Sequence, residues 1–364
     1  MLRRSHKKSR GGCVQCKRRH IKCDERRPAC ALCTMTNREC SFTTQPPTPP
    51  GTLPSTTPSP SPVPTHLSTD EINLTHMELL LHLTSTKEIF SLADGAEPYS
   101  SGVLFSLKTA LASPYLFYEF LAFSACHLAH VSPAREAHYL HQAITLQTKA
   151  ISLFNAEKLE VNKSNCVPVL LFTIILGHHL LADTLRTRVF KTLSSFLTHY
   201  IQCAATHRGI FTILNEAKPL LMESELNPVL SRSFTFTSST PRGSTCARLT
   251  TLISTSPTLT ESEKNLCHRA IKFLQLGFDA LDAPAEHEGN RFQMLFLWTV
   301  VVPPEFMALI SAKRVEALVI FAFYAKLLVA GRGIWQVGEA GSYILGMIRD
   351  EVGPLWDGWI YPAA

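Results

Sequence analysis

The chain has 364 residues, too many for one ordinary hydrophobic core, so about two domains are expected. Apolar residues make up 45% of it and charged residues 18%, which excludes a chain that is disordered throughout. The net charge of +6 is uneven: residues 1–42 hold 12 Lys and Arg against three acids, whereas the rest holds the other 23 basic and 26 acidic residues. This asymmetry predicts a polyanionic partner for the N-terminal end only.

Residues 1–12, MLRRSHKKSRGG, form a basic arm. Two compatible interpretations of its RRSHKKSR stretch are a nuclear-import signal and a disordered arm that contacts phosphates. No apolar segment typical of a secretory signal follows it. We therefore expect the thiols of this chain to meet a reducing compartment, where disulfides are disfavoured.

Residues 13–42 contain six cysteines, which repeat the pattern Cys-x2-Cys-x6-Cys twice. Each Cys-x2-Cys turn can direct two sulfurs at one tetrahedral zinc ion. Each half supplies three thiolates and a closed structural site needs four, so two ions are satisfied if one thiolate from each half is shared. A catalytic zinc would keep an open position, and a redox Cys-x2-Cys expects a βαβ setting that is missing here. The predicted ligands of two Zn²⁺ are Cys13, Cys16, Cys23, Cys30, Cys33 and Cys40.

This segment resembles the fungal Zn2Cys6 binuclear cluster, a small DNA-binding module. Residues 10–42 carry the resemblance through the six cysteines, the stretch KRRHIKCDE and the turn proline Pro28. A segment this short cannot fold on an apolar core, so zinc binding, worth about 10–16 kcal/mol in finger peptides, would supply the folding free energy. The resemblance implies that Cys13 and Cys30 bridge the ions, that Cys16 and Cys23 complete one site, and that Cys33 and Cys40 complete the other.

The same resemblance implies a nuclear, zinc-dependent transcription factor that regulates RNA polymerase II genes. Its partners would be double-stranded DNA and the transcription machinery. In this family the end of the first helix enters the major groove and reads a CGG triplet. The residue three before the third cysteine is a base reader, commonly Lys or Arg, and here it is His20. The predicted DNA-binding residues are Lys17, Arg18, Arg19, His20 and Lys22, of which Arg18, Arg19 and Lys22 suit phosphates.

Residues 43–67 are predicted to be a flexible, proline-rich linker. Residues 43–64 contain nine prolines and no Lys, Arg, Asp or Glu, which favours an extended spacer over a helix. No heptad pattern of a coiled coil is present. Two alternatives remain: the module binds DNA as a monomer, or a homodimer forms through the C-terminal domain on a loose tether.

Residues 68–362 are predicted to form a large all-α regulatory domain. Thr75-x-x-Glu78 suggests a capping box, HYLHQAITLQTKAISLF an amphipathic helix, and RVEALVIFAFYAKLLV a central helix. Residues 231–260 are rich in Ser and Thr and predict a mobile loop. The apolar run from Val167 falls short of the ~20 residues that span a bilayer, so we expect a buried helix and no membrane span. The amphipathic stripe of HYLHQAITLQTKAISLF is predicted to comprise Leu140, Ile144, Gln147, Ile151 and Phe154.

Candidate chemistry in this domain is sparse. Five cysteines lack metal-ligand spacing and are expected to be buried thiols. His178 and His179 lie in an apolar stretch, where they would be structural or would contact the polar end of a ligand. No nucleophile–base or acid–base arrangement is evident, so the chain is not expected to be an enzyme. The five cysteines are Cys126, Cys166, Cys203, Cys246 and Cys267.

Several apolar stretches of this domain resemble the regulatory domain of the sterol uptake control protein group. They are NLTHMELLLHL, LLFTIILGHHLLAD, LWTVVVPPEFMALI and RVEALVIFAFYAKLLV. This resemblance implies a helical body that holds a hydrophobic, sterol-like ligand in an apolar pocket. Because the broader group also includes pathway-specific regulators of metabolic gene clusters, the alternative is such a regulator with no small-molecule ligand.

Overall fold

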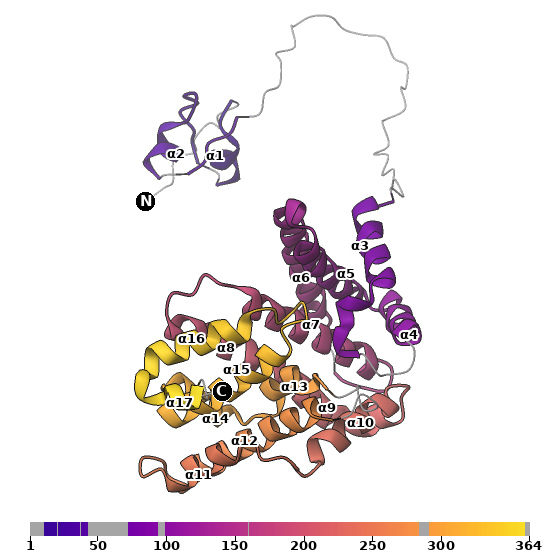
Figure 1. Cartoon of the computed structure of the whole chain (residues 1–364). Helices are drawn as coiled ribbons and strands as arrows, with labels where there is room; N and C mark the ends of the chain where they lie inside the picture. Colours follow the sequence, from indigo (N-terminus) through magenta and orange to yellow (C-terminus); the bar gives the residue numbers. More distant parts are fainter. Residues whose placement is uncertain are drawn as a thin grey trace, which may run out of the picture. The chain divides into compact units, whose positions relative to one another are not determined.

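The computed structural model describes residues 11–19, 21–36, 38–42, 72–93, 99–158, 160–283 and 291–360. The chain divides into two compact units, Met1–Thr69 and Asp70–Ala364 (Figure 1). Most of the predicted basic arm, at residues 1–10, and the whole predicted linker 43–67 lie outside the described residues.

The small unit contains two helices of five residues each, α1 (Val14–Arg18) and α2 (Ala31–Met35). Isolated helices of this length are not stable in water, so their conformation depends on tertiary links. Each helix begins after a cysteine, and the cysteine sulfur accepts the first backbone hydrogen bond as a cap. The interior of the unit consists of cysteines, with Ile21 and Phe42 packed beside them.

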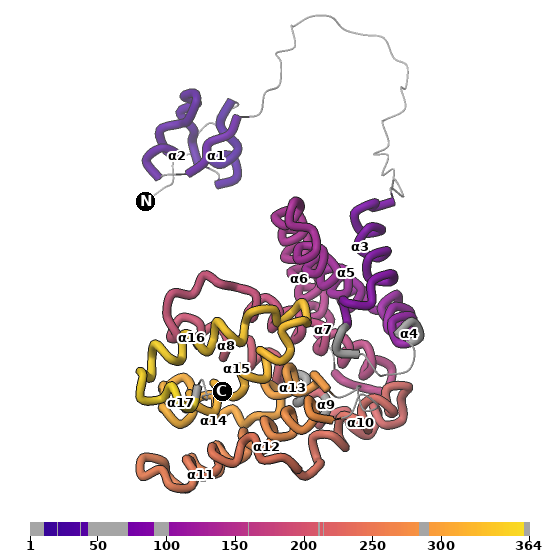
Figure 2. Tube along the Cα trace, viewed as in Figure 1, coloured from indigo at the N-terminus to yellow at the C-terminus, as the bar shows by residue number. Residues whose placement is uncertain are grey.

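The large unit is helical, and its described residues contain no strand, as the sequence predicts. Figures 1 and 2 show its helices in chain order, with α3 to α7 grouped on one side and the later helices on the other. The helices are α3 (Leu74–Ser85), α4 (Tyr99–Leu111), α5 (Pro114–Val131), α6 (Glu136–Glu157), α7 (Cys166–Arg186), α8 (Leu193–His207), α9 (Gly209–Met222), α10 (Asn227–Ser238), α11 (Ala247–Thr255), α12 (Glu261–Leu281), α13 (Gln293–Val301), α14 (Pro304–Ser311), α15 (Val315–Ala330), α16 (Ala340–Val352) and α17 (Asp357–Ile360).

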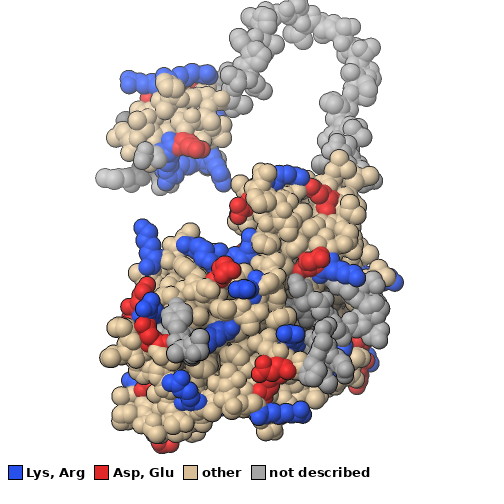
Figure 3. Space-filling view, viewed as in Figure 1, with Lys and Arg blue, Asp and Glu red and all other residues tan. Residues whose placement is uncertain are grey.

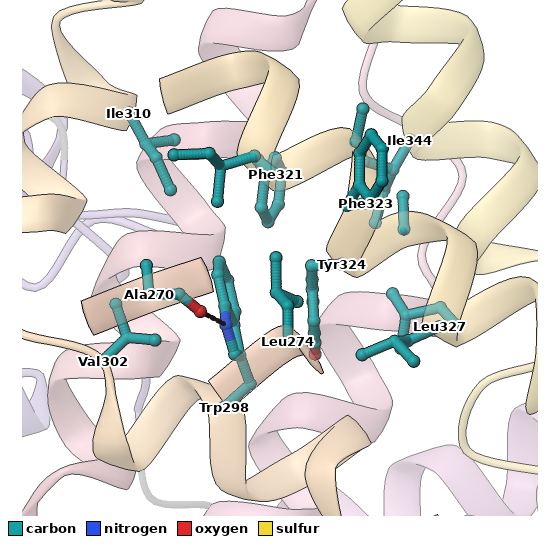
Figure 4. Packing of buried hydrophobic residues seen from close by; sticks show 14 of the residues in the cluster. Ala270, Leu274, Trp298, Val302, Ile310, Phe321, Phe323, Tyr324, Leu327 and Ile344 are labelled. Carbon is teal, nitrogen blue, oxygen red and sulfur yellow. Dashed lines mark hydrogen bonds between the residues drawn. The ribbon is translucent and has the colours of Figure 1, made fainter. Parts of the chain in front are cut away.

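The central helix predicted from RVEALVIFAFYAKLLV is α15, and most of its residues are buried. Around it, Trp298 stacks on Tyr324 with ring centroids 4.4 Å apart (Figure 4). The Trp298 indole N–H donates to the carbonyl oxygen of Ala270 at 3.4 Å, and the Tyr324 hydroxyl donates to that of Leu295 at 2.7 Å. These bonds satisfy the two polar groups that the aromatic stack buries, and they join α12, α13 and α15.

A second hydrophobic cluster is centred on α5, which packs against α3, α4, α6 and α7. Trp335, from the segment between α15 and α16, is buried in this cluster. Its indole N–H donates to the carbonyl oxygen of Ile89 at 3.2 Å, across 246 positions of the sequence. This contact attaches the late part of the chain to the first helices of the unit.

Two local predictions were wrong. The cap of α3 is Asn73, whose side chain accepts from the His76 N–H, so the capping box expected at Thr75 does not form. Residues 231–260, predicted as a mobile loop, belong largely to α10 and α11, because Leu230, Leu249 and Ile253 bury an apolar edge that outweighs their Ser/Thr-rich surroundings.

A third prediction, the apolar stripe of α6, was only partly right. Leu140, Ile151 and Phe154 pack partly buried against the second cluster, but Ile144 is 63% exposed. The fully buried stripe lies one residue earlier on the helix. The buried residues of α6 are Tyr139, Ala143, Leu146 and Ala150.

The apolar run from Val167 forms α7, which has 21 residues and is longer than the sequence pattern indicates. By length and composition it could cross a membrane, and the bent pair α13–α14 could do so only if it counts as one span. However, 56% of the most apolar window of α7 is buried among other helices. Its burial is typical of a core helix, as predicted.

Two glycines of α16 test how closely this helix packs. A Cβ atom at Gly341 would lie 2.5 Å from both the Ala325 carbonyl oxygen and the Val329 nitrogen of α15, and backbone atoms cannot move aside. We expect Gly341→Ala to lower the free energy of unfolding by about 1–3 kcal/mol. Gly346 has no atom within 4 Å of such a Cβ, so Gly346→Ala should raise it by roughly 0.5–1 kcal/mol through helix propensity.

The measurement is urea unfolding followed by tryptophan fluorescence, which reports on the large unit alone because all four tryptophans lie in it. Equal midpoints for the two variants would contradict the close contact between α15 and α16.

Candidate metal centre and nucleic-acid interface

The small unit brings the sulfurs of all six predicted ligands together. They form two groups of four, in each of which the sulfurs lie within 4.8 Å of one another. Cys13 and Cys30 belong to both groups, Cys16 and Cys23 complete one, and Cys33 and Cys40 complete the other. None of the six forms a disulfide.

The spacing of the sulfurs suits zinc. Cys13 Sγ lies 3.7 Å from Cys30 Sγ and 3.8 Å from Cys33 Sγ, and Cys16 Sγ lies 3.7 Å from Cys30 Sγ. A tetrahedral zinc ion with Zn–S bonds of about 2.3 Å has sulfurs about 3.8 Å apart. The donor set, sulfur only and with no carboxylate or histidine, is that of a closed structural site. When bound, zinc would supply the cross-links that this unit lacks in hydrophobic contacts.

Backbone N–H groups stabilise the anionic form of the two shared sulfurs. The N–H of Cys16 donates to Cys13 Sγ, and that of Cys33 donates to Cys30 Sγ, both at 3.4 Å. Burial opposes ionisation of Cys13, but the hydrogen bonds from Cys16, Cys30 and Cys40 together lower its pKa. The N–H of Cys33 is the main cause that lowers the pKa of Cys30. Both thiols are therefore prepared to act as thiolate ligands.

The two halves of the unit repeat each other with an offset of 17 residues. The N–H of Cys13 donates to Cys23 Sγ at 3.4 Å, and the N–H of Cys30 donates to Cys40 Sγ at 3.2 Å. Each half closes its helix with the same three backbone bonds, so the sequence repeat is also a structural one. The paired bonds are Lys17 N to Cys13 O with Thr34 N to Cys30 O, Arg19 N to Gln15 O with Thr36 N to Leu32 O, and Ile21 N to Cys16 O with Arg38 N to Cys33 O.

Polar side chains that the sequence analysis did not single out hold the halves together. The Asp24 carboxylate accepts the Ala31 N–H, at 3.1 and 3.2 Å to its two oxygens, at the start of α2. Glu25 accepts the Gly11 N–H at 3.0 Å. Gln15 Oε1 accepts the Ser41 N–H at 3.0 Å, which fastens the end of the unit to α1. Two of the three acids of the unit are thus used within it.

Most of the basic residues lie in the first half of the repeat, and the second half holds Arg38 alone. Lys17, Arg18, Arg19 and Lys22 are exposed, and none of the four forms an ion pair with a described residue. Lys and Arg side chains gather on the surface of the small unit (Figure 3). The corresponding positions of the second half carry no such cations. Predicted base reader His20 lies outside the described residues. In the second half, the positions equivalent to the four cations of the first half hold Thr34, Met35, Thr36 and Glu39.

Residues 11–49 match the model of the Fungal Zn(2)-Cys(6) binuclear cluster domain. The N-terminal domain of the chain therefore belongs to this family of zinc-binding domains. Among its relatives is the Sterol uptake control protein 2 of Candida albicans, 48% identical over 44 residues, which are 12% of this chain and 6% of that protein. The protein of that name in Saccharomyces cerevisiae is 54% identical over 41 residues, which are 11% and 4%.

A third relative, the Zn(2)-C6 fungal-type transcription factor of Gibberella zeae, is 56% identical over 41 residues, 11% of this chain and 8% of its own length. By name these relatives are regulators rather than enzymes. The chain thus spans less than a tenth of the length of each relative in these matches. The matches are too short to cover the helical body, so its resemblance to the sterol uptake control proteins stays a prediction.

The Asp24 carboxylate gives a test of how the halves depend on each other. We expect Asp24→Ala to weaken zinc binding by about fivefold, equivalent to about 1 kcal/mol for the loss of a helix N-terminal acceptor. Glu39→Ala is the matched control, because this substitution also removes one negative charge but breaks no hydrogen bond described for the unit. Competition with a chromophoric chelator measures both. If the two variants bind zinc equally well, the Asp24 bridge has no structural role.

Proposed function

We propose that this chain is a zinc-dependent, sequence-specific DNA-binding regulator of transcription that acts in the nucleus. The observation that carries the proposal is the distribution of charge over the repeat. Two halves with the same backbone differ in that only the first ends its helix in exposed cations. A charge run that merely kept the domain soluble would not need to be confined to one half.

We assign two zinc ions to the six thiols, with Cys13 and Cys30 shared. Six thiolates and two Zn²⁺ sum to −2, so residues 1–42 keep a charge near +7. Phosphates of duplex DNA neutralise such a charge with release of counterions, which makes binding dependent on salt.

Within this interface the residues have different roles. Lys17, Arg18, Arg19 and Lys22 would bind phosphates and fix the register of α1 on the duplex. His20 would donate to the guanine N7 or O6 of a CGG-like site. An imidazole is shorter than the Lys or Arg common at this position and lacks their permanent charge, so the preferred site is expected to deviate from the family triplet.

A pair of substitutions at equivalent positions of the repeat tests the interface in the full chain. We expect Arg18→Ala to weaken binding to every duplex and to lower the slope of log K against log salt by about 1. Met35→Ala, the matched change in the second half, should leave both unchanged. His20→Ala should cost about 1–3 kcal/mol on the preferred site and little on other sequences.

The preferred site would come from selection out of random DNA, followed by gel-shift titration. The proposal fails if the selected and random duplexes bind equally, or if Met35→Ala weakens binding as much as Arg18→Ala does.

We further propose that the helical body controls the output through a hydrophobic, sterol-like ligand. An open cleft of about 580 Å³ between α8 and α14 supports this, with Ile201, Pro304 and Ala308 among its apolar lining residues. Arg208 also lines the cleft, and its Nε and Nη2 atoms are buried without a hydrogen-bond partner among the described residues. Apolar surface beside a few polar groups, here Arg208 and Ser311, is typical of sites for small amphipathic ligands.

Lipid extraction and mass spectrometry of the purified full chain test this step. We expect a sterol-like lipid from the wild type and a several-fold lower yield from Ala308→Trp, because Ala308 is exposed in the cleft and a larger side chain there would occupy it. Val229→Trp, at an exposed position of α10, is the control. A lipid-free wild type would instead favour the regulator of a metabolic gene cluster without a small-molecule ligand, and would leave homodimerisation through the body as the means of control.

A further inference from the structure

A group of metal-binding side chains lies inside the helical body, away from the small unit. The ligand atoms of Cys126, His179 and Asp183 lie within 4.8 Å of one another. Cys126 Sγ is 3.8 Å from Asp183 Oδ1. Next to them, Nδ1 of His179 lies 2.9 Å from Oε1 of Glu119.

Helix periodicity explains how two helices assemble this group. Glu119 and Cys126 are seven residues apart on α5, which is two turns, and His179 and Asp183 are four apart on α7. Residues with these spacings share one face of a helix. Since α5 and α7 pack against each other, the two faces meet (Figure 1). The sequence separation of 53 residues between Cys126 and His179 is why no local motif revealed them.

The group is buried except for Asp183, which is partly exposed, and its polar atoms are incompletely satisfied. Cys126 and Glu119 are fully buried and His179 is 2% exposed. The ring of Phe123 packs edge-on against the His179 ring, with centroids 5.8 Å apart. Oε2 of Glu119 is buried and has no hydrogen-bond partner among the described residues. The Glu119 carboxylate thus has one oxygen bonded to the His179 ring and one left without a partner, so the surrounding side chains do not fully satisfy this site.

We propose that Cys126, His179 and Asp183 bind a divalent metal ion of the zinc class between α5 and α7. One sulfur, one nitrogen and one oxygen donor form a set that zinc accepts readily. Glu119 is a positioning residue, because its carboxylate holds one nitrogen of the His179 ring and orients the other, as carboxylates commonly do behind metal-bound histidines. The proposal does not depend on DNA binding by the small unit.

Charge balance is consistent with a dication. Arg186 lies beside the group, with Nη1 3.9 Å from Cys126 Sγ. With Cys126 as a thiolate and His179 neutral, the forms in which both residues bind a metal, the anions Cys126, Asp183 and Glu119 and the cation Arg186 sum to −2, which one divalent ion neutralises. The bound ion would clamp α5 to α7 at the centre of the second hydrophobic cluster. Without an ion, the same side chains form only a Cys–Asp hydrogen bond and a His–Glu pair.

The zinc content per chain distinguishes a site with a bound ion from a site without one. It is measured on the purified full-length protein by atomic mass spectrometry. We expect about three equivalents in the wild type, two in the small unit and one in the body. Cys126→Ser and Asp183→Asn should each lose one equivalent. Cys267→Ser, at another fully buried cysteine that belongs to no metal-binding group among the described residues, should lose none.

The decisive quantity is the difference of one equivalent between the wild type and the body variants. Cys30→Ser should lose zinc from the small unit and keep the ion of the body, so failure of the N-terminal cluster and failure of this site give different results. Circular dichroism tests whether each variant is folded. If Cys126→Ser does not fold, the zinc content of Asp183→Asn gives the same comparison. A wild type with two equivalents, or folded body variants with as much zinc as the wild type, would overturn the proposal.

Discussion

The N-terminal unit depends on one constraint: six sulfur atoms must stay within a few ångströms of one another in a segment with almost no hydrophobic core. Neighbouring sulfurs lie 3.7–3.8 Å apart, close to the edge of a zinc–sulfur tetrahedron. Two five-residue helices gain their starting points from the cysteines themselves, since Cys13 and Cys30 are both caps and candidate ligands. The cysteines that shape this unit are therefore also its candidate metal ligands.

This constraint leaves the surface side chains of the unit free to vary. Because the cysteine cluster and the backbone bonds define both halves of the repeat, the side chains on their surfaces are free to differ. The first half carries Lys17, Arg18, Arg19 and Lys22, and the second carries small, apolar or acidic residues instead. The repeated backbone thus carries cations in the last turn of its first helix and none in that of its second. Asp24 and Glu25 accept hydrogen bonds from backbone N–H groups within the unit.

The helical body is held together in a different way, by burial of apolar helices around α15 and around α5. Some of its buried polar groups find partners, as Trp298 and Tyr324 do, whereas others such as the Tyr200 hydroxyl have none among the described residues. Against this background the group at Cys126, His179 and Glu119 is exceptional, because charge is concentrated there in a dry environment. A cation at that point would make the contact between α5 and α7 depend on a bound ion as well as on packing.

The sequence by itself determined the zinc unit, since the ligands of such a cluster lie within 28 residues and their spacing is a property of the local chain. It also determined that the body is all-α and that RVEALVIFAFYAKLLV is its central helix, because long apolar periodicity survives any tertiary arrangement. Finer features were decided only by packing. The fully buried stripe of α6 lies one residue from the expected one, and Asn73 rather than Thr75 caps α3. The Ser/Thr-rich segment 231–260 forms parts of α10 and α11, with Leu249 and Ile253 buried. The meeting of Cys126 with His179 belongs to the same category, because residues far apart in sequence become neighbours only when two helix faces are pressed together.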